Sequence, residues 1–128
     1  MTLRMALVLG LSLFGSAPLA AHHFFVARYD ASSAVLLTGV VTRIEWTNPH
    51  SHITVDAKNA GGTVTWVCEG GSPGTLDREG LKRNDLKVGD IITIDAYPAK
   101  NGSHAAVIRR IILPNGRTIV APLAGADR

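Results

Sequence analysis

The feature that most constrains the fold is a series of short segments with β-strand character, each ended by turn-forming residues. In the segment 50–57, for example, apolar Ile53, Val55 and Ala57 alternate with polar residues, as they do on a strand with one buried face. Comparable segments cover residues 34–46, 63–70, 91–97, 105–113 and 117–120. Their lengths, together with 13 Gly and 6 Pro in 128 residues, predict a single all-β domain and disfavour a helical bundle.

One helix signal interrupts this series. Ser72 can cap a helix and Pro73 fits its first position, so a short helix through Leu76 to Leu81 is predicted between the third and fourth strands. The first strand is long, and Gly39 permits a bulge or a coil within it. This order predicts an OB-fold-like five-stranded Greek-key barrel with one short helix and a short C-terminal strand. A small open sandwich is the competing architecture.

Alternation also predicts which side chains share a face. The apolar residues that alternate along each strand, and are therefore expected on its inner face, are Leu36, Val40, Ile44 and Trp46 on the first, Ile53, Val55 and Ala57 on the second, Val64, Trp66 and Cys68 on the third, and Ile92, Ile94 and Ala96 on the fourth. The loop 58–62 is expected to join the second and third strands as a hairpin.

The N-terminal residues have the pattern of a secretory signal peptide. Arg4 is followed by an apolar run from Met5 to Phe14 and by small residues that end at Ala21. The run is broken too early for a membrane-spanning helix. We therefore predict a signal peptide over 1–21, a single mature domain over 22–128 with an N-terminal arm over 22–33, and a periplasmic or secreted location.

Charge and cysteine content exclude several classes of protein. Without Arg4, the mature chain has 12 Lys and Arg against 10 Asp and Glu, a net charge of +2, and its basic residues are scattered. This balance gives no electrostatic footprint for nucleic acid. The single cysteine, Cys68, cannot form an internal disulfide, and its position among apolar residues predicts a buried, inert thiol.

Histidines provide the candidate metal ligands. Four of the five His residues are His22, His23, His50 and His52. His50 and His52 are two positions apart on the predicted strand, so both imidazoles are expected on its solvent face, within reach of one ion. His104 falls in a predicted hairpin loop and is expected to be exposed and uninvolved.

The cleavage position determines what kind of copper site the N-terminus can form. A mature chain that starts at His22 offers an amine and an imidazole on one residue, and a third imidazole from His50 or His52 would complete a histidine brace for Cu(II). Cleavage after Ala20 would instead leave Ala21-His22-His23, which chelates Cu(II) through the amine, backbone amides and the imidazole of His23. Zinc could use three of the imidazoles and a water. Surface histidines beside a Pro turn are also common without any metal.

The other polar and aromatic candidates have simpler interpretations. Trp46 and Trp66 are predicted to anchor the core rather than to stack on sugars or bases. Glu69, at the end of its strand, is expected to accept backbone N–H bonds that fix the turn, or alternatively to orient a histidine. The sequence contains no nucleophile elbow, phosphate-binding loop or His-Glu-x-x-His motif, and we predict a protein that is not an enzyme.

Several motifs in order resemble a family of small exported bacterial domains of unknown function. They are AHHFF, RYD, EWTNPHSH, CEGGSPGTL and LKVGD. The resemblance implies an exported β-barrel and supplies no activity. It marks a set of motif residues: His22, His23, Glu45, Trp46, Asn48, Pro49, His50, Glu69, Gly70, Gly71, Ser72 and Pro73. Phe24 stands where the family usually has Ser, and Cys68 where it has a bulky apolar residue.

Three functions follow as expectations. The first is binding or delivery of a transition metal, with copper as the metal and His22, His23, His50 and His52 as ligands. The second is a metal-free periplasmic module that holds a partner protein or a saccharide, for which exposed Tyr29, Trp46 or Tyr97 would be the signature. A copper oxygenase built on the histidine brace is the least favoured, because a mature chain of 107 residues (128 minus 21) shows no obvious substrate surface.

Overall fold

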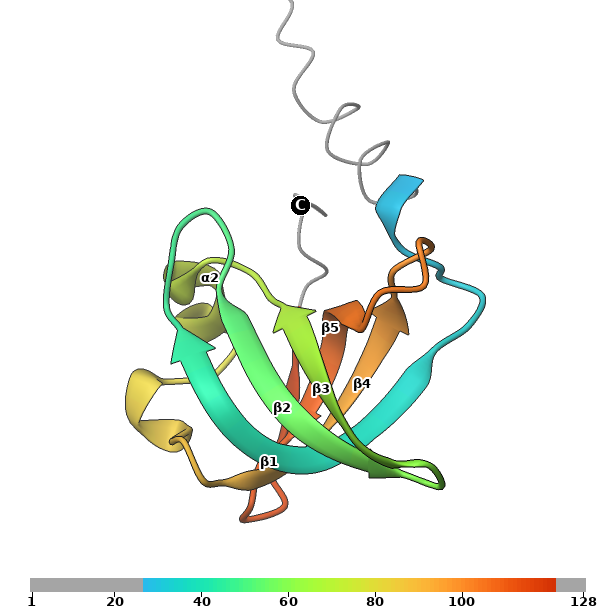
Figure 1. Ribbon diagram of the computed structural model, residues 1–128. Helices are drawn as coiled ribbons and strands as arrows, with labels where there is room; N and C mark the ends of the chain where they lie inside the picture. Colours follow the sequence, from blue (N-terminus) through green and yellow to red (C-terminus); the bar gives the residue numbers. More distant parts are fainter. Residues whose placement is uncertain (1–26, 122–128) are drawn as a thin grey trace, which may run out of the picture.

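The computed structural model describes residues 27–121, whose strands close into a five-stranded barrel (Figure 1). The elements in chain order are β1 (Val35–Glu45), β2 (His52–Asn59), β3 (Gly62–Glu69), α2 (Pro73–Arg78), the 3-10 turn η1 (Arg83–Asp85), β4 (Ile91–Pro98), β5 (Ala105–Ile112) and β6 (Thr118–Val120). β1 pairs with both β2 and β4, β2 with β3, and β4 with β5, all antiparallel. A parallel pairing of β3 with β5 closes the ring, and β6 pairs with β5 outside it. The predicted OB-fold-like barrel, with its short helix and short C-terminal strand, is confirmed.

β1 can serve two neighbours because it bends across the barrel (Figure 1). Gly39 is the point of closest approach, since a Cβ atom built on it would overlap the backbone carbonyl of Asp56 on β2. The bulge itself lies elsewhere, at the register shift between Val41 and Arg43. At Gly39 the paired strands β1 and β2 therefore approach each other closely, while the bulge falls farther along β1.

This bulge also corrects the predicted apolar face of β1. Before the bulge, Leu37 and Val41 point into the core while Leu36 and Val40 are exposed. After it, Ile44 packs against the core, as does Trp46 just beyond the strand. One extra residue switches which positions face inward, so a single alternation could not hold over the whole strand.

The remaining strands follow the predicted alternation. Ile53, Val55 and Ala57 are buried on β2, as are Ile92, Ile94 and Ala96 on β4, and Cys68 is buried with Trp66 packed against the same core. The hairpin between β2 and β3 is tighter than the predicted loop over 58–62, because strand pairing continues to the pair Asn59 and Gly62.

The helix starts where predicted and ends earlier. The Ser72 side chain caps α2 by accepting the Thr75 N–H at 3.2 Å, with Pro73 in the first turn, and Leu76 carries the helix into the core. The helix ends at Arg78 instead of continuing to Leu81, because Gly80 adopts φ +99 and turns the chain.

The described part of the arm, residues 27–33, packs against the outside of the barrel at the end of β4. The Asp30 N–H donates to the Pro98 carbonyl at 2.9 Å, and the Lys100 N–H donates to the Arg28 carbonyl at 2.9 Å. Between these bonds Tyr29 forms a bridge with Ala99 and a small second apolar cluster with Ala99 and Val107. Tyr29 therefore packs the described part of the arm against the barrel. Phe24 and Phe25 lie outside the described residues, as do the predicted signal peptide, His22 and His23.

Candidate functional site around Glu69

Glu69 is a carboxylate on the outside of the barrel that is nevertheless buried. It follows the inward-facing Cys68 on β3, so strand alternation points its side chain outward. The Glu69 side chain is only 9% exposed. The arm accounts for this burial, since Tyr29 packs on Val107, the register partner of Glu69 on β5. A carboxylate in such a place needs compensating donors.

Three side chains supply these donors. The Tyr29 hydroxyl donates to Glu69 Oε2 at 2.6 Å, and Arg28 Nη1 lies 3.4 Å from the same oxygen. His50 Nδ1 lies 2.7 Å from Oε1. Burial, followed by the hydrogen bond to the carboxylate, raises the pKa of Tyr29, so its hydroxyl keeps its proton and remains a donor. Glu69 thus joins the arm to the β1–β2 loop through one carboxylate.

This contact determines which nitrogen of His50 can bind anything else. A carboxylate only accepts hydrogen bonds, so the ring nitrogen that faces it carries the hydrogen. In neutral His50 the lone pair is then on Nε2, on the opposite side of the ring. The side chain is 35% exposed, which leaves an oriented imidazole at the molecular surface. Two roles were predicted for Glu69, as an acceptor of backbone N–H bonds or as a group that orients a histidine. Its side-chain contacts match the second role.

The β1–β2 loop that carries His50 is held by backbone bonds to the segment after β3. The Ser51 N–H donates to the Gly71 carbonyl at 3.0 Å, and the Gly70 N–H donates to the Ser51 carbonyl at 2.8 Å. Thr47 adds a hydroxyl bond of 2.8 Å to the His50 carbonyl, and the Asn48–Pro49 peptide bond in this loop is cis. Two segments that are distant in sequence, 48–52 and 69–73, therefore form one unit around Glu69.

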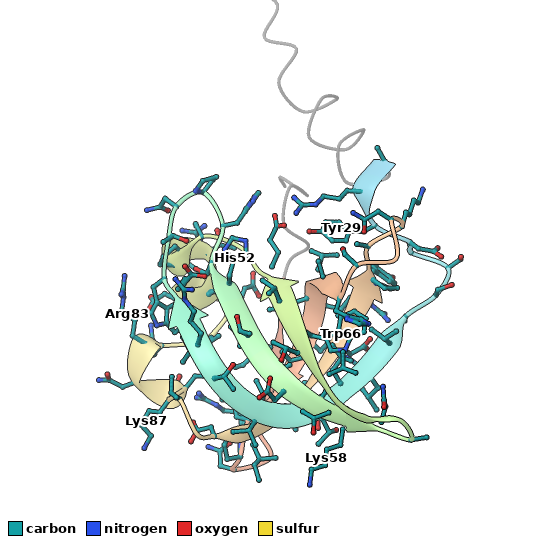
Figure 2. The ribbon with its side chains drawn as sticks, viewed as in Figure 1. Tyr29, His52, Lys58, Trp66, Arg83 and Lys87 are labelled. Carbon is teal, nitrogen blue, oxygen red and sulfur yellow. The ribbon has the colours of Figure 1, made fainter. Side chains whose placement is uncertain are left out.

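His52 lies next to this unit, at the first position of β2. It is the register partner of Glu45 on β1 and of Glu69 on β3, so the three side chains share the outer face of the sheet. Glu45 is paired with Arg43 at 2.9 Å. Figure 2 shows His52 and Tyr29 at the same end of the barrel. His50 itself precedes the strand, although it was predicted to lie within it, because the turn at Pro49 delays the start of β2.

The fifth histidine lies in a different loop from His50. His104 is exposed in the β4–β5 loop, as predicted, and its ring lies 5.1 Å from the ring of Trp66. Within residues 27–121, no three His, Cys, Asp or Glu side chains gather closely enough to hold a metal ion.

Two further predictions about single residues are confirmed. Cys68 is fully buried, and burial raises the pKa of its thiol to about 12, so it remains an unreactive thiol. Trp46 and Trp66 pack against the core. In contrast, the contacts of Tyr29 and Arg28 with Glu69 were not predicted. The sequence showed only that an aromatic residue and a cation stand next to each other in the arm.

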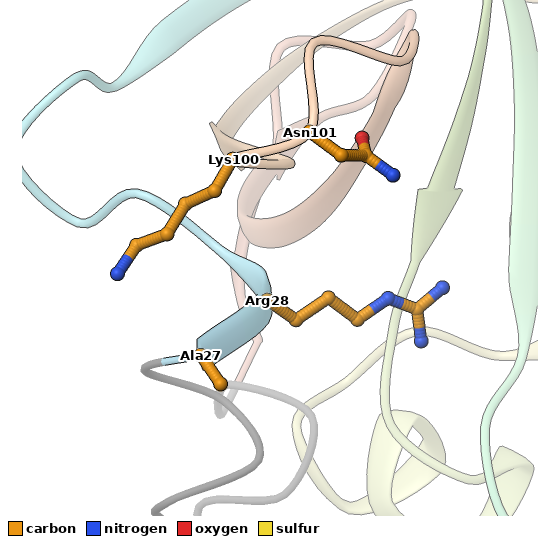
Figure 3. Close-up of a pocket in the computed structure, with 4 residues that line it drawn as sticks. All are labelled: Ala27, Arg28, Lys100 and Asn101. Atoms are coloured by element: carbon orange, nitrogen blue, oxygen red, sulfur yellow. The ribbon is translucent and has the colours of Figure 1, made fainter.

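A pocket of about 460 Å³ lies between the arm and the β4–β5 loop, lined by Ala27, Arg28, Lys100 and Asn101 (Figure 3). The side chains of Arg28 and Lys100 extend in opposite directions from it, so it does not concentrate their charges on one ligand. No helix within the described part of the chain is long and apolar enough to cross a membrane.

Comparison with known families places these features in context. Residues 11–108 match DUF6152, a family of unknown function. The chain belongs to this family. The matched region includes the arm, the β1–β2 loop and the segment after β3, and therefore every side chain that contacts Glu69. A search of curated proteins found no match.

Proposed function

We propose that this DUF6152 protein binds a transition metal ion, Cu(II) in the first place, and carries or delivers it outside the cytoplasm. The ligands are His50 and His52 together with His22 and His23 at the N-terminus. The observation that carries the proposal is the 2.7 Å contact between His50 Nδ1 and Glu69 Oε1. It orients an imidazole whose other nitrogen is available at the surface.

A carboxylate behind an imidazole is the arrangement that metal-binding histidines use. The carboxylate fixes the tautomer and the ring orientation, and it increases the basicity of the nitrogen that binds the metal. Such an arrangement is costly to maintain, since the buried Glu69 carboxyl group needs three donor side chains around it. In a surface histidine with no ligand, nothing would offset the free energy needed to bury the Glu69 side chain.

The anchoring of the arm at Tyr29 supports a site shared between His50 and the N-terminal histidines. Tyr29 is fixed on Glu69 Oε2, and the same carboxylate holds His50 through Oε1. His23 is six positions before Tyr29 in the sequence, a span of at most about 20 Å in extended chain. The proposal is that the N-terminal histidines reach His50, which among the described histidines is the one that a buried carboxylate orients.

Copper is favoured over zinc by the donors that the mature N-terminus would provide. A free amine and imidazole nitrogens suit the square-planar or T-shaped geometry of Cu(II). Zn(II) would accept the same imidazoles in a tetrahedral set and is the second metal to test. No catalytic step is part of the proposal, and the receiver of a delivered ion would be a periplasmic partner protein.

The alternative, a metal-free module for a saccharide or a partner protein, was expected to show exposed aromatic residues. Tyr29 is only 4% exposed, and Tyr97 is covered by the Arg109 guanidinium at 4.8 Å from its ring centre. These two positions therefore do not form an open stacking platform.

The test is Cu(II) binding by the protein produced through export, so that its N-terminus is naturally processed. Electron paramagnetic resonance with stoichiometric Cu(II) would be compared for the wild type and for His50→Ala, His52→Ala and Glu69→Gln. We expect a nitrogen-rich signal in the wild type that loses a nitrogen coupling in His50→Ala, with Cu(II) affinity about 10–100-fold weaker in Glu69→Gln.

His104→Ala is the matched control, because it removes an exposed imidazole away from Glu69. It should leave the Cu(II) signal unchanged. If His50→Ala also left the signal unchanged, copper would be confined to the terminal peptide and the shared site would be refuted. If the wild type bound neither Cu(II) nor Zn(II) in a titration monitored by calorimetry, the proposed function would be wrong.

A further inference from the structure

The outer face of the barrel formed by β1, β4, β5 and β6 carries several exposed apolar side chains. Its exposed apolar side chains, each between 40% and 69% exposed, are Leu36, Val40, Val88, Ile91, Ile112 and Val120. All but Val88 lie on strands, at positions whose neighbours in sequence point into the core. Isolated exposed apolar residues are normal, but a group on one sheet face requires an explanation.

Strand register places these residues together. Val40 is directly opposite Ile91, and Leu36 lies farther along the same β1–β4 ladder. Ile112 is opposite Thr93 on β4 and Thr118 on β6, so it joins the β4 side of the face to the edge strand. Val88 precedes Gly89, whose N–H bonds to the Val41 carbonyl at 2.8 Å and holds the loop against β1. The apolar side chains therefore share one face with polar ones, since Leu36 is opposite Asp95 and Val120 is opposite Arg110.

The polar groups within this face are already satisfied. The hydroxyls of Thr38 and Thr93 bond to each other at 2.9 Å. Asp95 is held by Arg110 Nη2 at 2.7 Å and by Arg109 Nη1 at 3.2 Å. A partner that covers the face would thus leave no carboxylate unpaired, and arginine is the cation most often found in interfaces.

The size of the patch fits a symmetric pair. The six side chains expose on the order of 400 Å² of apolar surface. A standard interface buries about 800 Å² per partner, of which about 500 Å² is apolar in homodimers. The patch supplies most of that area, and the flanking threonines and arginine stems can supply the rest. We propose that this face is the contact surface of a homodimer, with a second copy of this chain as its occupant.

The contact is independent of the metal site, because none of its residues contacts Glu69 or His50. Two copies joined here would keep their Glu69 clusters free, since Glu69 lies at the β3–β5 junction while the patch is centred on β1 and β4. The proposal can therefore be tested without metal and does not depend on the proposed function.

The experiment is sedimentation equilibrium of the exported, processed protein from about 1 µM to 500 µM. The matched variants are Val40→Lys, inside the patch, and Val67→Lys, on the outer face of β3, where the wild-type valines are 41% and 42% exposed. Both add one charge to an equally exposed valine. We expect a dimer mass for the wild type and for Val67→Lys, and a dimer dissociation constant at least tenfold higher for Val40→Lys.

A wild type that is monomeric over the whole range would overturn the proposal and point to a different partner for the face. The proposal would also be wrong if Val40→Lys and Val67→Lys weakened the dimer equally, or if neither weakened it. Circular dichroism checks that each variant is folded. Should Val40→Lys not fold, Ile91→Lys takes its place, because Ile91 is 63% exposed at the first position of β4 and tolerates a long polar side chain.

Discussion

Replacing Tyr29 with Phe should destabilise the fold by removing one hydroxyl. The substitution keeps the ring that packs on Ala99 and Val107 and removes only the donor to Glu69 Oε2. Hydrogen bonds to a charged group contribute about 1.5–3 kcal/mol. The bond is 2.6 Å long and buried, which favours the middle of that range or above, while Arg28 at 3.4 Å from the same oxygen limits the loss. We expect a loss of about 2 kcal/mol.

The measurement is urea and thermal unfolding of the mature protein, followed by circular dichroism. For a domain of this size, a loss of about 2 kcal/mol lowers Tm by roughly 10 °C. A double-mutant cycle separates the hydrogen bond from other effects, because in Glu69→Gln the acceptor is neutral. There Tyr29→Phe should cost at least 1 kcal/mol less than in the wild type.

Two results would refute this reasoning. If Tyr29→Phe lost less than about 0.5 kcal/mol, Glu69 would not depend on the hydroxyl. If the substitution cost the same free energy with Glu69 and with Gln at position 69, its effect would come from packing alone. In either case the arm would not be tied to the His50 side of the cluster, and the geometric support for the N-terminal ligands would be lost.

Two further predictions concern the barrel itself. Gly39→Ala should lower the free energy of unfolding, measured in urea, by about 3 kcal/mol or more, because its Cβ would overlap the Asp56 carbonyl. The control Gly61→Ala should change this free energy by less than about 1 kcal/mol. Similar effects of the two substitutions would contradict the close approach of β1 to β2 at Gly39. The thiol pKa of Cys68 rises from 9.0 to about 12 on folding, so between these pH values only the unfolded chain ionises, and stability falls as pH rises. Unfolding curves from pH 8 to 11 should therefore be less pH-dependent in Cys68→Ala, and an identical slope in both proteins would show that the thiol is not shielded.

The sequence predicted the barrel because its strands are mostly regular. Where one face is buried throughout, as on β2 and β4, alternation alone identifies the inward residues. It failed on β1, where the bulge between Val41 and Arg43 changes the face in the middle of the strand. A bulge depends on how β1 meets β2 and β4, which no local pattern contains.

The candidate site was likewise predictable only in part from the sequence. The sequence predicted His50 and His52 as candidate ligands by residue type and spacing, and it named two roles for Glu69, of which the orienting one matches the contacts seen. It could not show that Glu69 meets His50, because nineteen positions separate them and only the pairing of the loop with the segment after β3 brings them together. Tyr29 is further still, 40 positions from Glu69.

The sequence by itself thus determined the fold class, the helix start at Ser72 and the burial of Cys68, because these follow from local periodicity and capping chemistry. Only the tertiary structure decided which side chains surround Glu69 and which apolar residues of β1 remain outside. Both depend on contacts between segments that are distant in sequence. Closing the barrel sets these contacts through the parallel pairing of β3 with β5 and the return of the arm onto β4.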